Sequence, residues 1–203
     1  MSKHPAGARF LDFTAGLVLA AGGSSRLGQP KQLLPLGDST LLGTVLDTAR
    51  ECEFGQLVVA LGGASEEVRS AVDLSGCDVA ENPDYGEGCS SSIAAAMGIV
   101  DARARSLVLM LGDQPGVTPA AVEALLAGRG GAEMAVCRYD DGVGHPFSFG
   151  RELFASLAEL HGDKAVWKLR EQRAGSVAEV RVPGPVPRDV DTWDDYEAVL
   201  TAR

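Results

Sequence analysis

Short apolar runs alternate with helical patterns along the first two thirds of the chain, and this alternation constrains the fold more than any other feature. Three runs, at residues 17–21, 57–61 and 107–111, are apolar on both faces, as in strands that are buried on both sides. A fourth run, at residues 78–80, is a weaker strand pattern. Helical patterns follow them over residues 40–53, from Ser65 onward, over 91–101 and from Thr118 onward. Because parallel strands need helix-sized connections, these units predict an α/β fold with a Rossmann-like, mostly parallel sheet and helices on both faces.

The ends of these elements carry their own signals. Hydroxyl side chains that cap helix N-termini stand at Ser39 or Thr40, at Ser65 and at Thr118, which Pro119 follows at the first helical position. The last third then departs from the alternation, because residues 133–139 and 146–149 flank the turn signal Asp140-Asp141-Gly142. We expect a small antiparallel excursion there.

The remaining segments complete one domain. Helical patterns at 152–160 and 164–172, a strand at 177–182 and a closing helix at 193–202 follow the excursion. With no internal repeat and no low-complexity linker, the sequence predicts an N-terminal tail over residues 1–15 and a single domain over 16–203.

Composition excludes several classes of partner. The 203 residues carry 18 Lys and Arg against 28 Asp and Glu, a formal net charge of −10 that repels phosphate backbones and anionic lipid. We therefore expect neither a nucleic acid nor a membrane as partner. No apolar run approaches the ~20 residues of a membrane span, residues 1–15 lack a secretory pattern, and the four cysteines are widely spaced, as suits reduced thiols. These features predict a cytoplasmic protein.

A glycine-rich loop follows the first predicted strand, at the carboxyl end where ligands of open α/β sheets bind. It reads Gly22-Gly23-Ser24-Ser25-Arg26-Leu27-Gly28-Gln29-Pro30-Lys31. Small residues let backbone N–H groups approach a phosphate, and Arg26 and Lys31 add positive charge. The segment matches neither the Walker A motif nor the Gly-x-Gly-x-x-Gly fingerprint. The pattern favours a phosphate-binding loop over the alternative, a flexible surface loop with two solvated cations.

Asp113 follows the clearest buried strand, within Gly112-Asp113-Gln114-Pro115. Mg²⁺ typically takes one or two carboxylates and fills its other positions with substrate phosphates and water, so we expect Asp113 to bind Mg²⁺. Asp191 is the candidate second ligand, because Asp189 and Asp191 share one side of an extended segment. The alternatives are structural: Asp113 ends a turn, and Asp191 or Thr192 caps the last helix.

Three consecutive serines stand at the start of another predicted helix. The hydroxyl and N–H groups of Ser90, Ser91 and Ser92 suit a base or a phosphate, and they suit a helix cap equally well.

Six segments together resemble the nucleotidyltransferases of molybdenum cofactor synthesis. Residues 19–31 match the signature LAAGxSxRxGxxK of that family, and the other matches follow in the family's order along residues 16–200. They are Asn82-Pro83 with Gly88-Cys89-Ser90-Ser91-Ser92-Ile93, Gly112-Asp113-Gln114-Pro115, Gly144-His145-Pro146, Gly162-Asp163 and Asp189-Val190-Asp191-Thr192. Ala21 and Gly112 stand where the guanylyltransferase branch usually has Gly and Cys, so the chain is more similar to the molybdenum cofactor cytidylyltransferases.

The resemblance implies a Mg²⁺-dependent enzyme that transfers a cytidylyl group from CTP to the terminal phosphate of the molybdenum pterin and releases pyrophosphate. It implies catalytic roles for Arg26, Lys31 and Asp113, with the metal on Asp113 and Asp191. The nucleotide-binding residues it implies are Leu19, Ala20, Ala21, Gly22, Gly23, Ser24, Ser25, Arg26, Lys31, Gly88, Ser90, Ser91, Ser92 and Asp113. The acceptor-binding residues are Gln114, Gly144, His145, Pro146 and Lys164. The partners are CTP, the phosphorylated pterin and a molybdoenzyme that receives the product.

One departure from the family concerns the acceptor. Relatives often read Gly-Asp-x-Gly-Ala-Arg where this chain has Gly162-Asp163-Lys164-Ala165-Val166-Trp167, so the arginine is replaced. Lys164 and Lys168, one helical turn apart, offer positive charge in place of that arginine. The alternative is that both lysines are simply exposed to water on the surface of a helix. Methylerythritol phosphate, phospholactate and sugar phosphates stay open as acceptors. A non-catalytic carrier of a nucleotide-bearing cofactor is the alternative from another class, which Arg26, Lys31 and Asp113 together disfavour.

Overall fold

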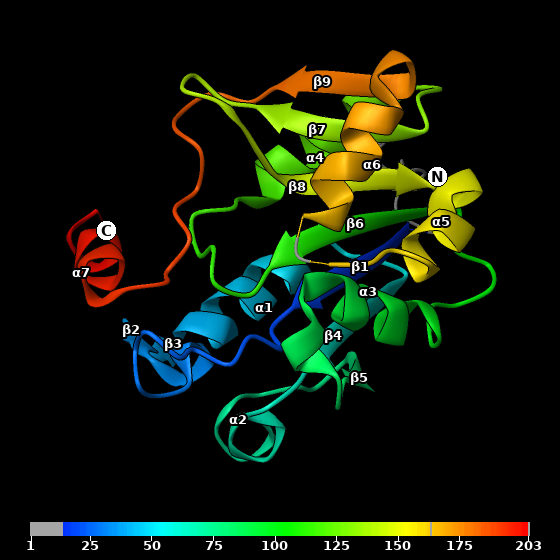
Figure 1. The fold of residues 1–203 in the computed structure, drawn as a ribbon. Coiled ribbons are helices and arrows are strands. Elements are labelled where there is room, and N and C mark those ends of the chain that lie inside the picture. The colour runs from blue at the N-terminus through cyan, green and yellow to red at the C-terminus, as the bar shows by residue number, and fades with distance from the viewer. Residues whose placement is uncertain (1–13, 163, 203) are drawn as a thin grey trace, which may run out of the picture.

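A seven-stranded sheet forms the centre of the chain. The computed structural model describes residues 14–162 and 164–202, and within them the sheet runs in the order β5-β4-β1-β6-β8-β7-β9 (Figure 1). Its strands are β1 (Thr14–Leu19), β4 (Gln56–Leu61), β5 (Cys77–Glu81), β6 (Ser106–Leu111), β7 (Met134–Arg138), β8 (Val143–Gly150) and β9 (Val177–Arg181). Neighbours among β5, β4, β1 and β6 are parallel. The predicted mostly parallel sheet is confirmed.

An antiparallel strand interrupts the parallel order. β8 lies between β6 and β7 and is antiparallel to both, whereas β9 pairs in parallel with β7 at the edge. Tyr139 N–H donates to Gly142 O at 2.8 Å, which closes the predicted turn between β7 and β8. The antiparallel excursion is confirmed. A separate pair of two-residue strands, β2 (Pro35–Leu36) and β3 (Ser39–Thr40), is too short to have left a pattern in the sequence.

Helices cover both faces of the sheet, as predicted (Figure 1). The helices α3 (Cys89–Met97), α5 (Phe154–Ala158) and α6 (Ala165–Gln172) pack their apolar residues on one face. The helices α1 (Leu41–Glu51), α2 (Ser65–Ala71) and α4 (Pro119–Arg129) pack on the other face. No helix of the described residues has the length and apolar character that a bilayer crossing requires.

The first strand begins before the apolar run at 17–21. Thr14 and Ser106 are buried side by side at the starts of β1 and β6, with their hydroxyl oxygens 2.8 Å apart. One hydroxyl donates a hydrogen bond to the other, which lets two polar residues be buried in the sheet. A search for apolar runs does not detect such residues. Ala20 and Ala21, predicted as strand, lie beyond the end of β1 and open the loop that follows.

The predicted helix caps hold in two of three cases. Gly43 N–H donates to Thr40 Oγ1 at 3.0 Å, and Ala121 N–H donates to Thr118 Oγ1 at 3.2 Å. Ser65 does not cap: it is the first residue of α2, and its hydroxyl donates to Glu81 instead. The Ser65 hydroxyl therefore bonds the charged carboxylate of Glu81 and does not accept from a backbone N–H of its own helix, as the sequence pattern predicted.

The C-terminal segment returns to the start of the chain. The last helix, α7 (Trp193–Thr201), packs through Tyr196 and Val199 on Leu34 and Leu36, near β2 and β3. Tyr196 also donates its hydroxyl proton to Pro35 O. This docking accompanies the approach of Asp191 to the loop that follows β1, where it pairs with Arg26 and Lys31.

Candidate functional site

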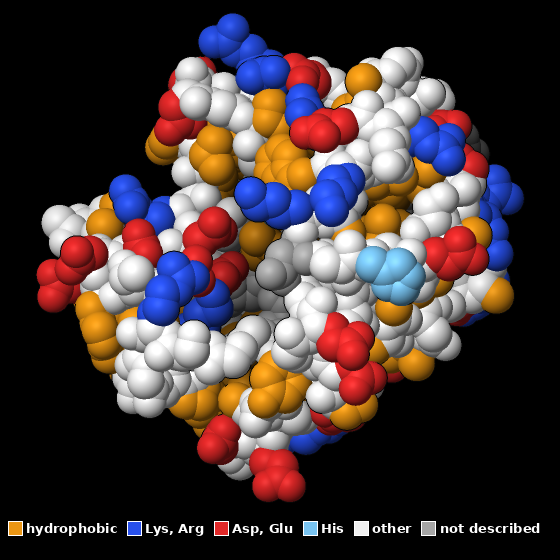
Figure 2. Space-filling model, viewed as in Figure 1, with side chains coloured by type: hydrophobic (Ala, Val, Ile, Leu, Met, Phe, Trp, Pro, Cys, Tyr) orange, Lys and Arg blue, Asp and Glu red, His pale blue; other side chains and the backbone are white. Residues whose placement is uncertain are grey.

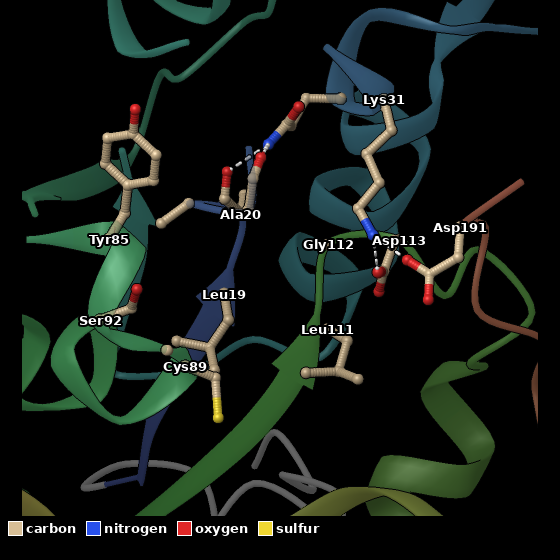
Figure 3. A pocket seen from close by; sticks show the side chains of 14 residues that line it. Leu19, Ala20, Lys31, Tyr85, Cys89, Ser92, Leu111, Gly112, Asp113 and Asp191 are labelled. Carbon is tan, nitrogen blue, oxygen red and sulfur yellow. Dashed lines mark hydrogen bonds and ion pairs between the residues drawn. The ribbon is translucent and has the colours of Figure 1, made fainter. Parts of the chain in front are cut away.

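A cavity of about 380 Å³ opens at the carboxyl ends of β1 and β6. Its lining comes from the loop after β1, the start of α3, the end of β6 and the C-terminal segment (Figure 3). The lining residues are Leu19, Ala20, Ala21, Gly22, Lys31, Gln32, Tyr85, Gly88, Cys89, Ser92, Leu111, Gly112, Asp113 and Asp191. On the molecular surface, basic and acidic side chains stand together beside a hollow (Figure 2).

The loop from Ala20 to Lys31 is held in place by its own hydrogen bonds. Ser24 adopts a φ of +51°, which lets its hydroxyl accept the Lys31 N–H at 2.9 Å. Gln32, buried beneath the loop, donates to Ala20 O at 2.6 Å and to Gly22 O at 3.1 Å. These bonds tie the loop to neighbouring residues, and Lys31 is paired with carboxylates, which favours the phosphate-binding loop over a surface loop with solvated cations. Gln32 carried no signal in the sequence, because a buried glutamine has no fixed spacing from the carbonyls it satisfies.

Five consecutive backbone N–H groups of this loop are free. No described residue accepts a hydrogen bond from the N–H groups of residues 22–26, and Gly22, Gly23, Ser25 and Arg26 are exposed. Successive free amides in a tight loop form a concave anion-binding surface. The arrangement is chemically able to hold phosphate oxygens.

Two cations and two carboxylates meet at the edge of this loop. Lys31 Nζ donates to Asp113 Oδ2, and to Asp191 Oδ1 at 2.8 Å (Figure 3). Arg26 Nη2 lies 2.8 Å from Asp191 Oδ2. Burial by itself lowers the pKa of Lys31, but the adjacent Asp113 and Asp191 outweigh it and raise the pKa. Burial likewise raises the pKa of Asp191, but Lys31 and Arg26 outweigh it and lower the pKa. Both shifts favour the charged forms of Lys31 and Asp191.

The donor set suits a hard divalent cation. Asp113 and Asp191 offer carboxylate oxygens to one shared cation, here the Lys31 ammonium, and the described residues hold no group of three or more acidic, His or Cys ligands. Mg²⁺ needs only one or two carboxylates when substrate phosphates and water complete its shell. A metal at this position would be held by Asp113 and Asp191 together with the nucleotide.

Gln114 lies behind this cluster instead of in the cavity. It is buried, and its Nε2 donates to Asp189 Oδ1 at 2.6 Å and to Pro187 O at 3.2 Å. Val190 N–H also donates to Asp113 O at 3.0 Å. Burial, followed by the charge of Asp113, raises the pKa of Asp189. These contacts fasten the 187–191 segment to the end of β6, so Gln114 positions Asp191.

The structure shows whether Asp191 and the three serines cap helices, which was the structural alternative to binding a ligand. Thr192, not Asp191, caps α7, in a reciprocal capping box with Asp195. Gly88, with a φ of +102°, stands at the N-cap of α3, which has no side-chain cap there. Ser91 and Ser92 both accept from Asn82 Nδ2, at 2.9 and 2.8 Å. Ser90 and Ser92 are both buried, and of the two only Ser92 lines the cavity, together with Gly88.

The predicted acceptor residues lie outside this cavity. His145 is 9% exposed, stacked on Phe147 with ring centroids 4.1 Å apart and edge-on to Trp167 at 6.2 Å. Burial lowers the pKa of His145 to about 4. Gly144 and Pro146 are also buried in β8, next to β6, whose last residue Leu111 lines the cavity; Lys164 is exposed just before α6. The structure thus puts these residues on neighbouring elements and not in the lining. Asp163 lies outside the described residues.

Tyr85 and Cys89 are lining residues that sequence reasoning missed. Cys89 stood within a matched segment, and its position beside Ser90 was the available signal. Tyr85 had none, because an aromatic residue in a polar loop is compatible with any turn.

Known proteins share this sequence and fold. Residues 16–177 match the family model of the MobA-like NTP transferase domain. The chain is 33% identical over 170 residues to the bifunctional protein GlmU of Cupriavidus pinatubonensis (strain JMP 134 / LMG 1197), which covers 79% of this chain and 37% of that protein. The chain spans about a third of the length of this GlmU and of two others that it matches.

Solved structures agree over nearly the whole chain. The Mycobacterium tuberculosis Rv0371c homologue from Mycobacterium sp. strain JC1 matches with a TM-score of 0.90 and 56% identity, over 94% of this chain and 96% of that one. Rv0371c from M. tuberculosis H37Rv in complex with manganese matches with a TM-score of 0.82 and 48% identity, over 94% and 99%. The chain belongs to the family of MobA-like NTP transferase domains.

Proposed function

We propose that this protein is a nucleotidyltransferase that transfers the cytidylyl group of CTP to the terminal phosphate of the molybdenum pterin. The observation that carries the proposal is the row of five free N–H groups at residues 22–26, next to Arg26, Lys31, Asp113 and Asp191. Such a site binds a triphosphate and a divalent cation together, which a nucleotidyltransferase requires.

The reaction needs positioning and charge neutralisation more than proton transfer. An acceptor phosphate oxygen attacks the α-phosphorus of CTP, the new P–O bond forms, and the bond to pyrophosphate breaks with its electron pair leaving on pyrophosphate. The nucleophile is already an anion, so no general base is needed. The loop amides, Arg26 and Lys31 hold the phosphates and neutralise charge that builds on the leaving pyrophosphate. Mg²⁺ bound at Asp113 and Asp191 would add further charge neutralisation at the phosphates.

Several observations support the finer assignments. The cytidylyl donor rests on Ala21 and Gly112, which match the cytidylyltransferase branch, and the pterin acceptor rests on the order of the six matched segments. The manganese complex of the M. tuberculosis relative supports a divalent metal, with Mg²⁺ as our assignment. Gly144, His145, Pro146 and Lys164 are our acceptor side, on the elements beside β6. A cytoplasmic location, with a molybdoenzyme to receive the product, completes the proposal.

Pyrophosphate release tests the reaction. Purified protein with Mg²⁺ and molybdopterin should release pyrophosphate from CTP faster than from GTP, UTP or ATP. Asp113→Ala should lower kcat/KM roughly 100-fold or more, the usual size of a lost preorganised charge contact. Asp47→Ala, which removes an exposed carboxylate on α1 paired with Arg50, serves as the matched control and should retain activity.

The alternative functions give different results in the same assay. Release that ignores the pterin but requires methylerythritol phosphate, phospholactate or a sugar phosphate identifies another acceptor and refutes the pterin. Nucleotide binding without turnover on any acceptor identifies a carrier. Activity that survives Asp113→Ala refutes the role of Asp113.

A further inference from the structure

Tyr85 is an exposed aromatic side chain in the lining of the candidate site. It is 40% exposed, and it lines both the main cavity and a second one of about 400 Å³. The loop residues Gly22 to Ser25 line the second cavity, so Tyr85 borders the free amides as well as the main cavity. Figure 3 shows it on the opposite side of the main cavity from Lys31, Asp113 and Asp191. The cavity therefore has a charged end and an aromatic end.

Two glycines after β4 make room for this ring. A Cβ on Gly63 would lie 2.7 Å from the Tyr85 Cζ and hydroxyl oxygen, and one on Gly62 would lie 2.8 Å from the Tyr85 Cβ and 2.6 Å from Ala21 O. Real side chains do not approach so closely. The tyrosine consequently packs directly on backbone, and its place is determined by the neighbouring strand end as well as by its own loop.

The segment that carries Tyr85 is fastened on both sides. Asp84 N–H donates to Asn82 Oδ1 at 3.0 Å, while Asn82 Nδ2 donates to Ser91 and Ser92 on α3. Glu87 N–H donates to Asp84 O at 2.9 Å and closes a 3-10 turn over Tyr85–Glu87. The ring is thus presented before any ligand arrives, which lowers the entropic cost of binding.

We propose that Tyr85 is the platform on which the base of the bound nucleotide stacks. The inference rests on the proposed function, because a nucleoside triphosphate has an aromatic end and a charged end that match the two ends of the cavity. Ser92 supports the assignment: it lines the same cavity and accepts from Asn82, and the described residues give its hydroxyl proton no acceptor. That proton is available to a carbonyl oxygen of the base.

Calorimetric binding to two probes tests this role. CTP carries base and triphosphate, whereas inorganic tripolyphosphate carries charge alone. Tyr85→Leu should weaken CTP binding roughly 10-fold, within the range of lost base–aromatic stacking, and leave tripolyphosphate binding unchanged. Tyr85→Phe should retain CTP affinity, because the ring face remains. Ile99→Ala removes another exposed apolar side chain, outside both cavities, and should change neither affinity.

The outcomes separate this inference from the proposed function. If wild-type protein binds CTP and Tyr85→Leu binds it equally well, the platform is refuted and the proposed function stands. Equal weakening of CTP and tripolyphosphate also refutes it, since the variant would then disturb the phosphate loop. If wild-type protein binds CTP in a Tyr85-dependent way but never releases pyrophosphate with an acceptor, the proposed function fails and the platform stands.

Discussion

Lys31 pairs with two carboxylates in the structure, and in the proposed function it also binds a substrate phosphate. In the structure its ammonium neutralises Asp113 and Asp191, the same carboxylates that we assign to the metal. Its side chain is only 14% exposed, so the attraction is little screened by solvent. A metal that binds these carboxylates competes with the ammonium, which is then available for a phosphate. Lys31 and the metal should consequently exclude each other until a triphosphate is bound.

Substitution of Lys31 tests this competition. Lys31→Met should bind Mn²⁺ more tightly than wild-type protein in the absence of nucleotide, by roughly 10-fold or about 1.4 kcal/mol, because the two carboxylates lose their resident cation. Electron paramagnetic resonance of free Mn²⁺ measures the affinity. Lys168→Met, at an exposed lysine outside the cavity, is the matched control. An unchanged or weaker Mn²⁺ affinity in Lys31→Met would contradict the competition.

At the scale of elements, the end of β4 constrains the site as closely as the loop after β1 does. Gly62 allows the strand end to approach Ala21 and Tyr85 at distances that no side chain permits. Tyr85 in turn packs on Gly63. The two loops therefore have to fit each other, although 40 residues of chain separate Gly22 from Gly62.

Gly62→Ala should disrupt this fit. A methyl group 2.6 Å from a backbone oxygen requires a backbone shift, which typically costs about 1–3 kcal/mol of stability. We expect a lower urea midpoint and weaker CTP binding together. Gly131→Ala, where a Cβ would meet nothing within 4 Å, is the control and should leave both unchanged. If the Gly62→Ala variant kept the stability and the CTP affinity of wild-type protein, the close contact between the two loops would not be required.

The sequence predicts those elements that depend on local pattern. The apolar runs, the caps at Thr40 and Thr118 and the turn at 140–142 each involve residues close along the chain, and all are present. The sequence does not predict Gln32 or Tyr85, whose contacts are with backbone that only the tertiary fold brings near. Gln114 was assigned to the acceptor because of its neighbours in the sequence; its side chain instead binds Asp189, 75 residues away.

At the scale of the whole molecule, the chain has a net negative charge, and most of its described arginines and lysines have a hydrogen bond or ion pair. Among the arginines and lysines of residues 14–162 and 164–202, only Lys164 and Lys168 lack a hydrogen bond or ion pair. Both stand at α6, on the side of the sheet where His145 and Trp167 pack together. Within the described part of the chain, the unpaired lysines thus lie on the side that we assign to the acceptor.

The buried His145 should make global stability depend on pH. Its pKa in the folded protein is about 4, against an ordinary value of 6.5, so the unfolded chain takes up the proton first as pH falls. Stability is full above pH 6.5 and is lost progressively towards pH 4, where the loss from this group approaches about 3 kcal/mol. Urea unfolding of wild-type protein and His145→Gln, at pH 7.5 and pH 5, measures the difference.

The variant should lose less stability than wild-type protein over this interval, by about 2 kcal/mol. The control is His161→Gln, at an exposed position, which should follow the wild-type profile. Parallel profiles for wild-type protein and His145→Gln would contradict the assignment of the pH dependence to this histidine.

The contact between Lys31 and Asp191 spans 160 residues of sequence. A ribosome that has synthesised the four strands β1, β4, β5 and β6 and the turn after β6 has already made the phosphate loop, Lys31 and Asp113. It has not yet made Asp191, or the helix α7 whose packing on Leu34 and Leu36 brings Asp191 to the loop. The charge cluster can therefore close only after the C-terminal segment has emerged and docked, so that a nascent or truncated chain carries the phosphate loop without its complete set of charges.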